Sequence, residues 1–544
     1  MSMSNTVSRR SFLQGAGAVA GASALGVMAA SALADEAAPE AAIAAKVEDA
    51  VFAESRVVVD PIADDQLEAT YDYDVVVVGA GTAGTTAAFA AADKGGVKVA
   101  VLQNVSTPIS QGNMGAGLVI DESTEWGLKR FIHDWNVNTL HASDYFMVEN
   151  YTKYSGYGVE MLLNLARESG FPEENILVSD DMIEYENGER VCSRRLLFID
   201  KPITWGDAMT SISTIGPDHN VDYYFNMPGV QLVQDDAGKV VAVIGKNEDT
   251  GGYVRFNVTK GVILATGSFI NNQAMLARYN TQAVGYTAKV SGRLGDGHLM
   301  GVLAGGVLPN GIYTKMCHDN DTGPFQSVPL LAVNYDGERF INEEIDSTLW
   351  CNATARAKEK GRMFQVVDST YPQICEALGM KPPTEEKLLG HMPGTEQSNA
   401  KGAYGFFSAT YKGDTLEELA EQLGLPAENL VATVERYNEL AEAGLDVDFG
   451  KDSKYLFPIA EPPFYIVNTW SRLSTILAGL AINEYQQVVD AAGTPIEGLY
   501  AAGNCSGTPG GQSDWLQVSL GESLGFALNE GYVAGSHIVG ALEA

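Results

Sequence analysis

Cysteine is scarce in this chain of 544 residues, and its spacing excludes several kinds of site. The five cysteines are scattered, and no two of them form a C-x-x-C pair. Iron–sulfur clusters and structural zinc need closely spaced thiolates, and covalent c-type haem needs C-x-x-C-H. We therefore expect no metal site and no haem, so that any electrons this chain uses must come from another molecule.

Basic residues are also few. Lys and Arg total 35 against 69 Asp and Glu, which gives a formal net charge of -34. So acidic a surface repels phosphate backbones and argues against nucleic acid as a partner. The charge either keeps the protein soluble or attracts a basic partner protein. With 45% hydrophobic and 19% charged residues, the composition is that of a globular protein, and the length predicts two or three domains.

The N-terminus has the pattern of an export signal. Arg9 and Arg10 precede an Ala- and Gly-rich apolar stretch over 15–33, and 32–34 (ALA) offers a small-x-small cleavage site. This order is typical of twin-arginine signals, which send folded proteins across a membrane. The stretch has too little Leu, Ile and Phe for a membrane anchor. We predict a signal peptide over 1–34 and an extracytoplasmic protein.

A βαβ unit follows a predicted mobile linker over 35–71. Residues 73–78 (YDVVVV) predict a strand buried on both faces, 85–94 an Ala-rich helix, and 97–102 (VKVAVL) a second strand. Such a unit is the context that a dinucleotide-binding glycine motif requires.

The glycine motif G-x-G-x-x-G lies between the first strand and the helix. Gly79 permits the tight turn, Gly81 lets a pyrophosphate approach the backbone, and Gly84 lets helix pack on strand. The helix N-terminus then offers free N–H groups to the diphosphate. We predict a Rossmann-type dinucleotide site. An acidic residue usually ends the second strand and binds the ribose, whereas this chain has Gln103, which can accept a hydrogen bond but carries no charge.

Further motifs favour FAD over NAD. They are 263–267 (ILATG), 295–297 (GDG), and 499–503 (LYAAG), which leads into a predicted helix start at 521–524 (GESL). A helix start that points at the flavin would stabilise the negative charge of reduced flavin. Over about 72–540 the chain resembles the fumarate reductase / 3-ketosteroid 1-dehydrogenase family of flavoproteins. The runs 331–343 (LAVNYDGERFINE), 429–438 and 443–450 support the resemblance.

The resemblance implies an α/β protein with a split FAD-binding domain and an inserted α+β capping domain. We assign 72–305 and 466–544 to the FAD-binding domain and 306–465 to the cap. Within the cap, a capped amphipathic helix is predicted from 414 and another over 428–442, so we expect a mostly helical insert. FAD is expected to be held non-covalently. The cofactor-binding positions that the motif and the resemblance give are Gly79, Ala80, Gly81, Thr82, Ala83, Gly84, Gln103, Asn104, Gly112, Asn113, Val230, Ala265, Thr266, Gly267, Asp296, Gly503, Asn504, Ser523 and Leu524.

The chain differs from both branches of this family at the positions that bind and protonate the substrate. Where fumarate reductases carry an Arg proton donor, a His and a carboxylate-binding Arg, the matching positions are Gln326, the 474–479 stretch (STILAG), and Gln517 or Val518. We do not expect fumarate to be a substrate. Asn504 matches the ketosteroid dehydrogenases, but their ketone-polarising tyrosine segment is replaced by 513–516 (SDWL).

The remaining candidates for catalysis are three residues. Tyr313 is the first choice of proton donor and His318, a general acid near its free pKa, the second. Arg472 is always charged and could orient the substrate in place of the missing clamp. The competing interpretations are a core tyrosine, a loop histidine and a salt bridge.

These observations together predict an exported FAD-dependent oxidoreductase that reduces an activated C=C bond in an enone or an α,β-unsaturated acid or lactone. Two alternatives stay open: a ketosteroid-like dehydrogenase that runs in the oxidative direction, and a non-catalytic flavin electron-transfer subunit. The complete cap argues against the second, because a pure carrier needs no substrate lid. We expect a small-molecule substrate and an external electron partner, a cytochrome or a quinone-linked protein.

Overall fold

The computed structural model describes residues 50–199, 205–317, 323–325, 328–345, 349–401, 409–512 and 514–542. The predicted signal peptide, His318 and Gln326 lie outside these residues. The chain forms two compact units. The first unit comprises Met1–Thr281, Ser291–Thr314 and Thr475–Ala544, and the second comprises Gln282–Val290 and Lys315–Ser474. The cap, predicted over 306–465, corresponds in sequence to most of the second unit.

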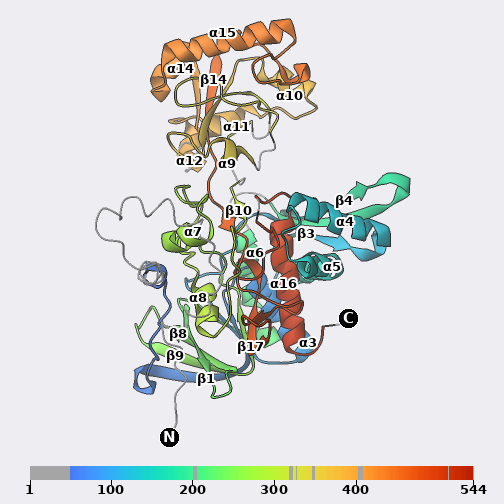
Figure 1. Cartoon of the computed structure of the whole chain (residues 1–544), viewed down its shortest axis with the longest axis vertical. Coiled ribbons are helices and arrows are strands. Elements are labelled where there is room, and N and C mark those ends of the chain that lie inside the picture. The colour runs from blue at the N-terminus through green and yellow to red at the C-terminus, as the bar shows by residue number, and fades with distance from the viewer. Residues whose placement is uncertain are drawn as a thin grey trace. The chain divides into compact units, whose positions relative to one another are not determined.

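The first unit is built on a twisted, mostly parallel sheet (Figure 1). Its strand order is β16-β17-β9-β1-β2-β6, and β8 pairs with β9 and with β7. Strands β17, β9, β1, β2 and β6 run parallel, which confirms the predicted Rossmann-type fold. The bounds are β1 (Leu67–Val78), β2 (Val99–Leu102), β6 (Val221–Tyr224), β7 (Gly229–Gln234), β8 (Val240–Lys246), β9 (Tyr253–Leu264), β16 (Gln487–Val489) and β17 (Pro495–Ala501).

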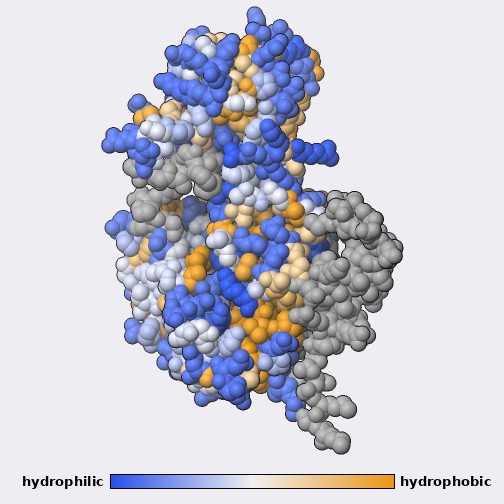
Figure 2. All heavy atoms as spheres, turned by 90° about the vertical axis from the view of Figure 1, so that its left-hand side faces the viewer, coloured by the Kyte–Doolittle hydropathy of each residue, from blue (hydrophilic) through white to orange (hydrophobic). Residues whose placement is uncertain are grey.

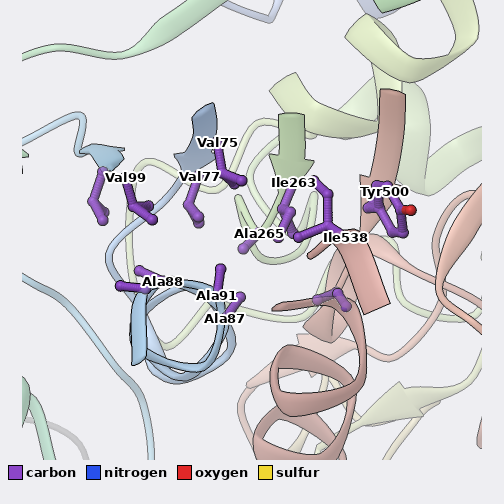
Figure 3. Close-up of a cluster of buried hydrophobic side chains, with 14 of the residues drawn as sticks. Val75, Val77, Ala87, Ala88, Ala91, Val99, Ile263, Ala265, Tyr500 and Ile538 are labelled. Atoms are coloured by element: carbon purple, nitrogen blue, oxygen red, sulfur yellow. The ribbon is translucent and has the colours of Figure 1, made fainter. Parts of the chain in front are cut away.

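Two helices, α3 (Thr82–Gly95) and α16 (Glu522–Ile538), pack on one face of this sheet and against each other. Their contact is close because glycine replaces a side chain at two positions of α16. A Cβ on Gly531 would overlap the backbone of Ala83, and one on Gly535 would overlap that of Ala87. Small α3 residues and β-branched strand residues therefore fill the space between sheet and helices (Figure 3).

The first unit also contains a second, smaller sheet with its own helices. A three-stranded antiparallel sheet has the order β3-β5-β4 and packs against α4, α5 and α6. These strands were not predicted. The bounds are β3 (Met114–Val119), β4 (Ile176–Glu184), β5 (Arg190–Phe198), α4 (Glu125–Asn138), α5 (Tyr145–Glu168), α6 (Trp205–Thr214), α7 (Gln273–Tyr279) and α8 (Asp296–Leu303).

The second unit contains a four-stranded antiparallel sheet with the order β11-β12-β14-β13. The sheet and the helices given below confirm the expected α+β cap, although the strands themselves were not predicted, because strands of three to seven residues carry too little alternation to stand out in the sequence. The bounds are β11 (Leu331–Val333), β12 (Arg362–Val367), β13 (Ala409–Gly413), β14 (Phe464–Trp470), α9 (Trp350–Ala353), α10 (Tyr371–Ala377), α11 (Glu385–Gly390), α12 (Glu396–Lys401), α14 (Leu416–Leu423) and α15 (Ala427–Ala443).

The predicted start of α14 is confirmed in detail. Thr415 accepts a hydrogen bond from the N–H of Glu418, whose side chain reaches back to the N-cap, so the two form a capping box. The helix ends at Gly424 in the left-handed region (φ 67°). Helices α14 and α15 bury their apolar faces against the sheet.

A buried charge network occupies the sequence run that supported the family resemblance. The Arg339 guanidinium contacts the carboxylates of Glu343 and Asp446, each at 2.8 Å, and Lys451 lies 3.2 Å from Glu343. The side chains of Glu343, Asp446 and Lys451 are fully buried. The charges of these four residues are therefore paired inside the second unit.

Part of the predicted mobile linker is attached to the first unit. Val51 is buried and its carbonyl oxygen accepts a hydrogen bond from Asn272 at 2.9 Å. Arg56 forms an ion pair with Asp296 at 2.8 Å, and the N–H of Val58 donates to the carbonyl oxygen of Val230 at 3.0 Å. From residue 50 onward, the segment is thus held against the first unit.

The surface is mostly hydrophilic, as expected from the many charged residues of the sequence. Hydrophilic residues cover most of the face in Figure 2, with an apolar area among them. Within the described part of the chain, no helix is long and apolar enough to cross a membrane.

Candidate active site

The glycine turn has the geometry that a dinucleotide needs. Gly79 lies in the left-handed region (φ 113°), and a Cβ there would overlap the carbonyl of Ala265. A Cβ on Gly84 would overlap the carbonyl oxygen of Gly79. At Gly81, by contrast, the nearest atom to a Cβ would be the carbonyl oxygen of Ile109 at 3.3 Å. Gly79 and Gly84 thus shape the turn, and the space above Gly81 is left for a ligand.

The start of α3 is available to an anion. Gly81 is the N-cap of α3, and no side chain caps the helix within the described residues. Its first-turn N–H groups and the helix dipole therefore face the position of a diphosphate. The Thr82 hydroxyl lies 2.6 Å from that of Ser110, which ties the loop after β2 to the helix start.

Gln103 lies at the end of β2, as predicted, but its side chain is used inside the protein. Its Oε1 accepts a hydrogen bond from the N–H of Ala80 at 3.2 Å, and its Nε2 donates to the carbonyl oxygen of Thr107 at 2.8 Å. The side chain is buried. It holds the glycine turn to the loop that would flank a ribose.

Three segments far apart in the sequence meet beside this turn. The Thr266 hydroxyl accepts from the N–H of Gly297 at 3.1 Å and lies 3.6 Å from the Cys505 sulfur. Thr266 follows β9, Gly297 lies in the first turn of α8 and Cys505 follows β17. Asp296, at the start of α8, forms its ion pair with Arg56. The structure thus brings together the ILATG, GDG and LYAAG motifs in one place.

A small cavity lies between the turn after β17 and the start of α16. Gly503 and Asn504 line it from the turn, and Ser523, Phe526 and Glu530 line it from the helix. Helix α16 also has no side-chain cap in the described residues, because its N-cap is Gly521 with φ 91°. Its dipole therefore acts on the cavity, as expected for a flavin ring.

The other predicted cofactor residues lie around these elements. Gly112 is in the left-handed region (φ 83°), and a Cβ there would lie 3.1 Å from Leu524. Asn104 and Asn113 flank the loop between β2 and β3. Val230 is buried in β7.

Burial keeps two groups beneath the GDG turn uncharged at neutral pH. It lowers the pKa of His298 to about 4 and raises the pKa of Cys505 to about 12. The His298 Nε2–H donates to the carbonyl oxygen of Ala478 at 3.1 Å, and Nδ1 lies 3.9 Å from the Cys505 sulfur. Neither group supplies a charge to the cofactor.

Tyr313 lies in the first unit with its ring buried. The ring stacks on Tyr279 with centroids 5.2 Å apart, and the hydroxyl donates to the carbonyl oxygen of Pro309 at 2.6 Å. Burial raises the pKa of Tyr313 well above its usual range. The hydroxyl therefore keeps its proton and uses it in a hydrogen bond to the backbone.

The other residues predicted for the substrate site belong to different parts of the chain. Arg472 and Ser474 are buried residues of the second unit. In the first unit, Gln517 accepts a hydrogen bond on Oε1 from the N–H of Gly521 at 3.1 Å, and Trp515 is buried against Trp135. Gln517 is thus committed to the start of α16.

Sequence reasoning missed three side chains near the cofactor positions: Arg56, Ser110 and Glu530. Nothing in the sequence marked Arg56 or Ser110, because their partners are far along the chain. Glu530 could have been found, since it is an acid on an otherwise apolar helix face between Leu528 and Val533.

The family described as FAD binding domain matches residues 74–523 of this chain. The chain belongs to this family. It is therefore a FAD-dependent oxidoreductase, and the predicted fold, enzyme class and cofactor are confirmed. The twin-arginine translocation pathway signal matches residues 6–26, which confirms export by that route.

Members of this family with known activities match most of the chain. The vinyl phenol reductase of Lactiplantibacillus plantarum is 26% identical over 491 residues, which cover 86% of this chain and 96% of the relative. The urocanate reductase of Eggerthella lenta is 27% identical over 498 residues, which cover 86% of this chain and 75% of the relative. Among solved structures, the open conformation of a flavocytochrome c3 fumarate reductase matches with a TM-score of 0.66 at 23% identity, over 89% of this chain and 82% of that one.

Proposed function

We propose that this exported flavoprotein reduces an activated C=C bond in an enone or an α,β-unsaturated acid or lactone, and that fumarate is not its substrate. Bound FAD supplies a hydride donor at N5. The glycine turn, the start of α3 and the turn at 503–506 would hold the cofactor. Both relatives above are named as reductases of compounds with a conjugated C=C bond, which supports the reaction class.

One observation carries the choice of substrate. The position at which fumarate reductases bind a carboxylate with arginine is Gln517 or Val518 here. The Gln517 amide oxygen binds the N–H of Gly521. A neutral amide that is committed to a backbone N–H cannot clamp a second carboxylate, so the substrate needs only one carbonyl or carboxylate group.

We further propose Tyr313 as the proton donor, His318 as the second candidate and Arg472 as the residue that orients the substrate. The Tyr313 hydroxyl would have to release Pro309 to protonate a substrate, which costs a hydrogen bond of about 1 kcal/mol. This requirement makes Tyr313→Phe informative, because the variant keeps the ring and loses only the hydroxyl. If Tyr313 is the donor, turnover falls about a hundredfold and dithionite reduction of the flavin is unchanged.

The electron partner is external, a cytochrome or a quinone-linked protein of the cell envelope, and FAD is held without a covalent bond. Acid precipitation should release unmodified FAD. Flavin that stays with the precipitate would refute the non-covalent assignment.

The deciding experiment is anaerobic reoxidation of the dithionite-reduced protein by a panel of enones, enoates, unsaturated lactones and fumarate. We expect reoxidation by at least one of the first three classes and none by fumarate. Rapid reoxidation by fumarate would refute the substrate proposal. Reduction of the oxidised protein by saturated ketosteroids, without any reoxidation by enones, would establish a ketosteroid-like dehydrogenase instead.

A further inference from the structure

Glu530 is an acid in the interior of the first unit, near the middle of α16. Its side chain is buried, with 1% of the residue exposed. Its Oε2 accepts two hydrogen bonds of 2.6 Å, one from the N–H of Gly503 and one from the hydroxyl of Ser506. A single carboxyl oxygen thus ties the turn after β17 to α16.

The turn that Glu530 holds is confined on its other side by α3. Gly503 is in the left-handed region (φ 68°), and a Cβ there would lie 3.0 Å from the Cβ of Ala83. Since Ala83 belongs to the first turn of α3, the start of α3, the 503–506 turn and α16 form one packed assembly. A change at Glu530 therefore alters both the turn and the shape of the space beside it.

Glu530 also lines the cavity at this turn, together with Asn504, Ser523 and Phe526. It is the one ionisable residue among the described residues that line this cavity. Any ligand in the cavity lies beside a group that is neutral or negative according to the pH.

Two buried carboxyl groups lie on α16. Burial raises the pKa of Glu522 well above its usual range, but its carboxyl group accepts hydrogen bonds from the N–H groups of Val518 and Ser519, away from the 503–506 turn. Burial raises the pKa of Glu530 to about 8, although the hydrogen bonds from Ser506 and Gly503 lower it and the charge of Asp144 raises it further. Burial also places the pKa of Cys505 at about 12 and that of Tyr151, on α5, well above 10. Strand β3 carries no charged residue, and α3 carries its two charged residues in its last turn.

We propose that Glu530 is a positioning residue for the flavin, which holds the 503–506 turn against α16 and, by losing its proton beside the cavity, makes the reduction potential of bound flavin depend on pH. A carboxylate next to the flavin opposes the negative charge that reduction adds, so ionised Glu530 lowers the potential. The inference rests on FAD binding but not on the proposed substrate.

The test compares Glu530→Gln and Glu530→Ala with Asp144→Asn. Asp144 is a matched control because its carboxylate holds Thr508, farther along the same loop, through hydrogen bonds of 2.9 and 2.8 Å. Redox titration of the FAD-loaded protein from pH 6 to pH 9 gives the midpoint potential without any substrate. Titration of the apoprotein with FAD gives the affinity.

We expect Glu530→Gln to match the native protein at pH 6 and to have the higher potential at pH 9, because glutamine stays neutral. Asp144→Asn should keep a pH-dependent potential, with the dependence moved to lower pH because the charge that raises the pKa of Glu530 is removed. Glu530→Ala should weaken FAD binding at least tenfold, since both hydrogen bonds to the turn are lost. Parallel pH profiles for the native protein and Glu530→Gln would overturn the inference, as would an equal change in Asp144→Asn. Failure of all variants and the native protein to bind FAD would instead refute the cofactor assignment.

Discussion

The glycine motif has two roles, helix packing at Gly84 and ligand approach at Gly81, and substitutions at the two positions should have separate effects. In Gly84→Ala the new Cβ would overlap the carbonyl oxygen of Gly79 and lie 3.0 Å from its carbonyl carbon. Both atoms are backbone in a packed turn, so strand and helix must move apart. Overpacking of this kind costs about 1–3 kcal/mol, a large part of the roughly 5–15 kcal/mol by which a domain is stable.

Gly81→Ala should leave the fold nearly intact. Gly81 has φ of -80°, which alanine adopts freely, and its Cβ would meet only the Ile109 carbonyl oxygen at 3.3 Å. A shift of a few tenths of an ångström relieves that contact, so we expect a loss of stability below about 1 kcal/mol. The same Cβ would stand between the backbone N–H groups and the pyrophosphate. Each charged hydrogen bond lost there is worth about 1.5–3 kcal/mol, which corresponds to roughly a tenfold to hundredfold weaker FAD affinity.

The assay measures each variant twice, by thermal unfolding of the apoprotein and by fluorescence titration with FAD. Gly81→Ala should unfold near the native temperature and bind FAD at least tenfold more weakly, whereas Gly84→Ala should unfold several degrees lower. If Gly81→Ala bound FAD within about threefold of the native affinity, the pyrophosphate would lie elsewhere and the assignment of the turn would fail.

Three further outcomes can be checked separately. Replacing Arg9 and Arg10 by Lys should retain the precursor inside the cell, and equal export of both forms on immunoblots of cell fractions would contradict the role of the pair. Arg339→Ala should destabilise the protein by about 3–5 kcal/mol in chemical unfolding, because buried Asp446 loses its cation and Glu343 keeps only Lys451, and a change below about 0.5 kcal/mol would show that the network is not needed. Burial opposes the ionisation of Asp446, but hydrogen bonds from Arg339 and from backbone N–H groups outweigh it and lower its pKa to about 2. Because the folded-state pKa lies below the unfolded value of 3.8, the stability from this group is complete above about pH 4 and is lost as pH falls towards 2, a dependence that Arg339→Ala should flatten in acid unfolding curves.

The sequence by itself determined the parts of this protein that depend on short stretches of chain. The glycine turn and the capping box of α14 are read within a few residues, because backbone geometry and local hydrogen bonds fix them. The export signal is read from the order of its residue types, two arginines before an apolar stretch. The order of the FAD motifs then identified the family. Strand β3 and those of the second unit were not predicted, because they pair with partners far along the chain and their own pattern is weak. Strands β4 and β5 form a hairpin, which was not predicted because polar residues 179–181 (SDD) interrupt the apolar pattern of β4.

Only the tertiary structure decided how the motifs are joined. Asp296 meets Arg56 across 240 residues, and Glu530 meets Gly503 across 27. Gln103 binds the backbone of the glycine turn, whereas the sequence assigned it to a ribose. No local pattern encodes such pairs, because parallel strands with long crossovers bring their ends together only after the whole sheet has formed.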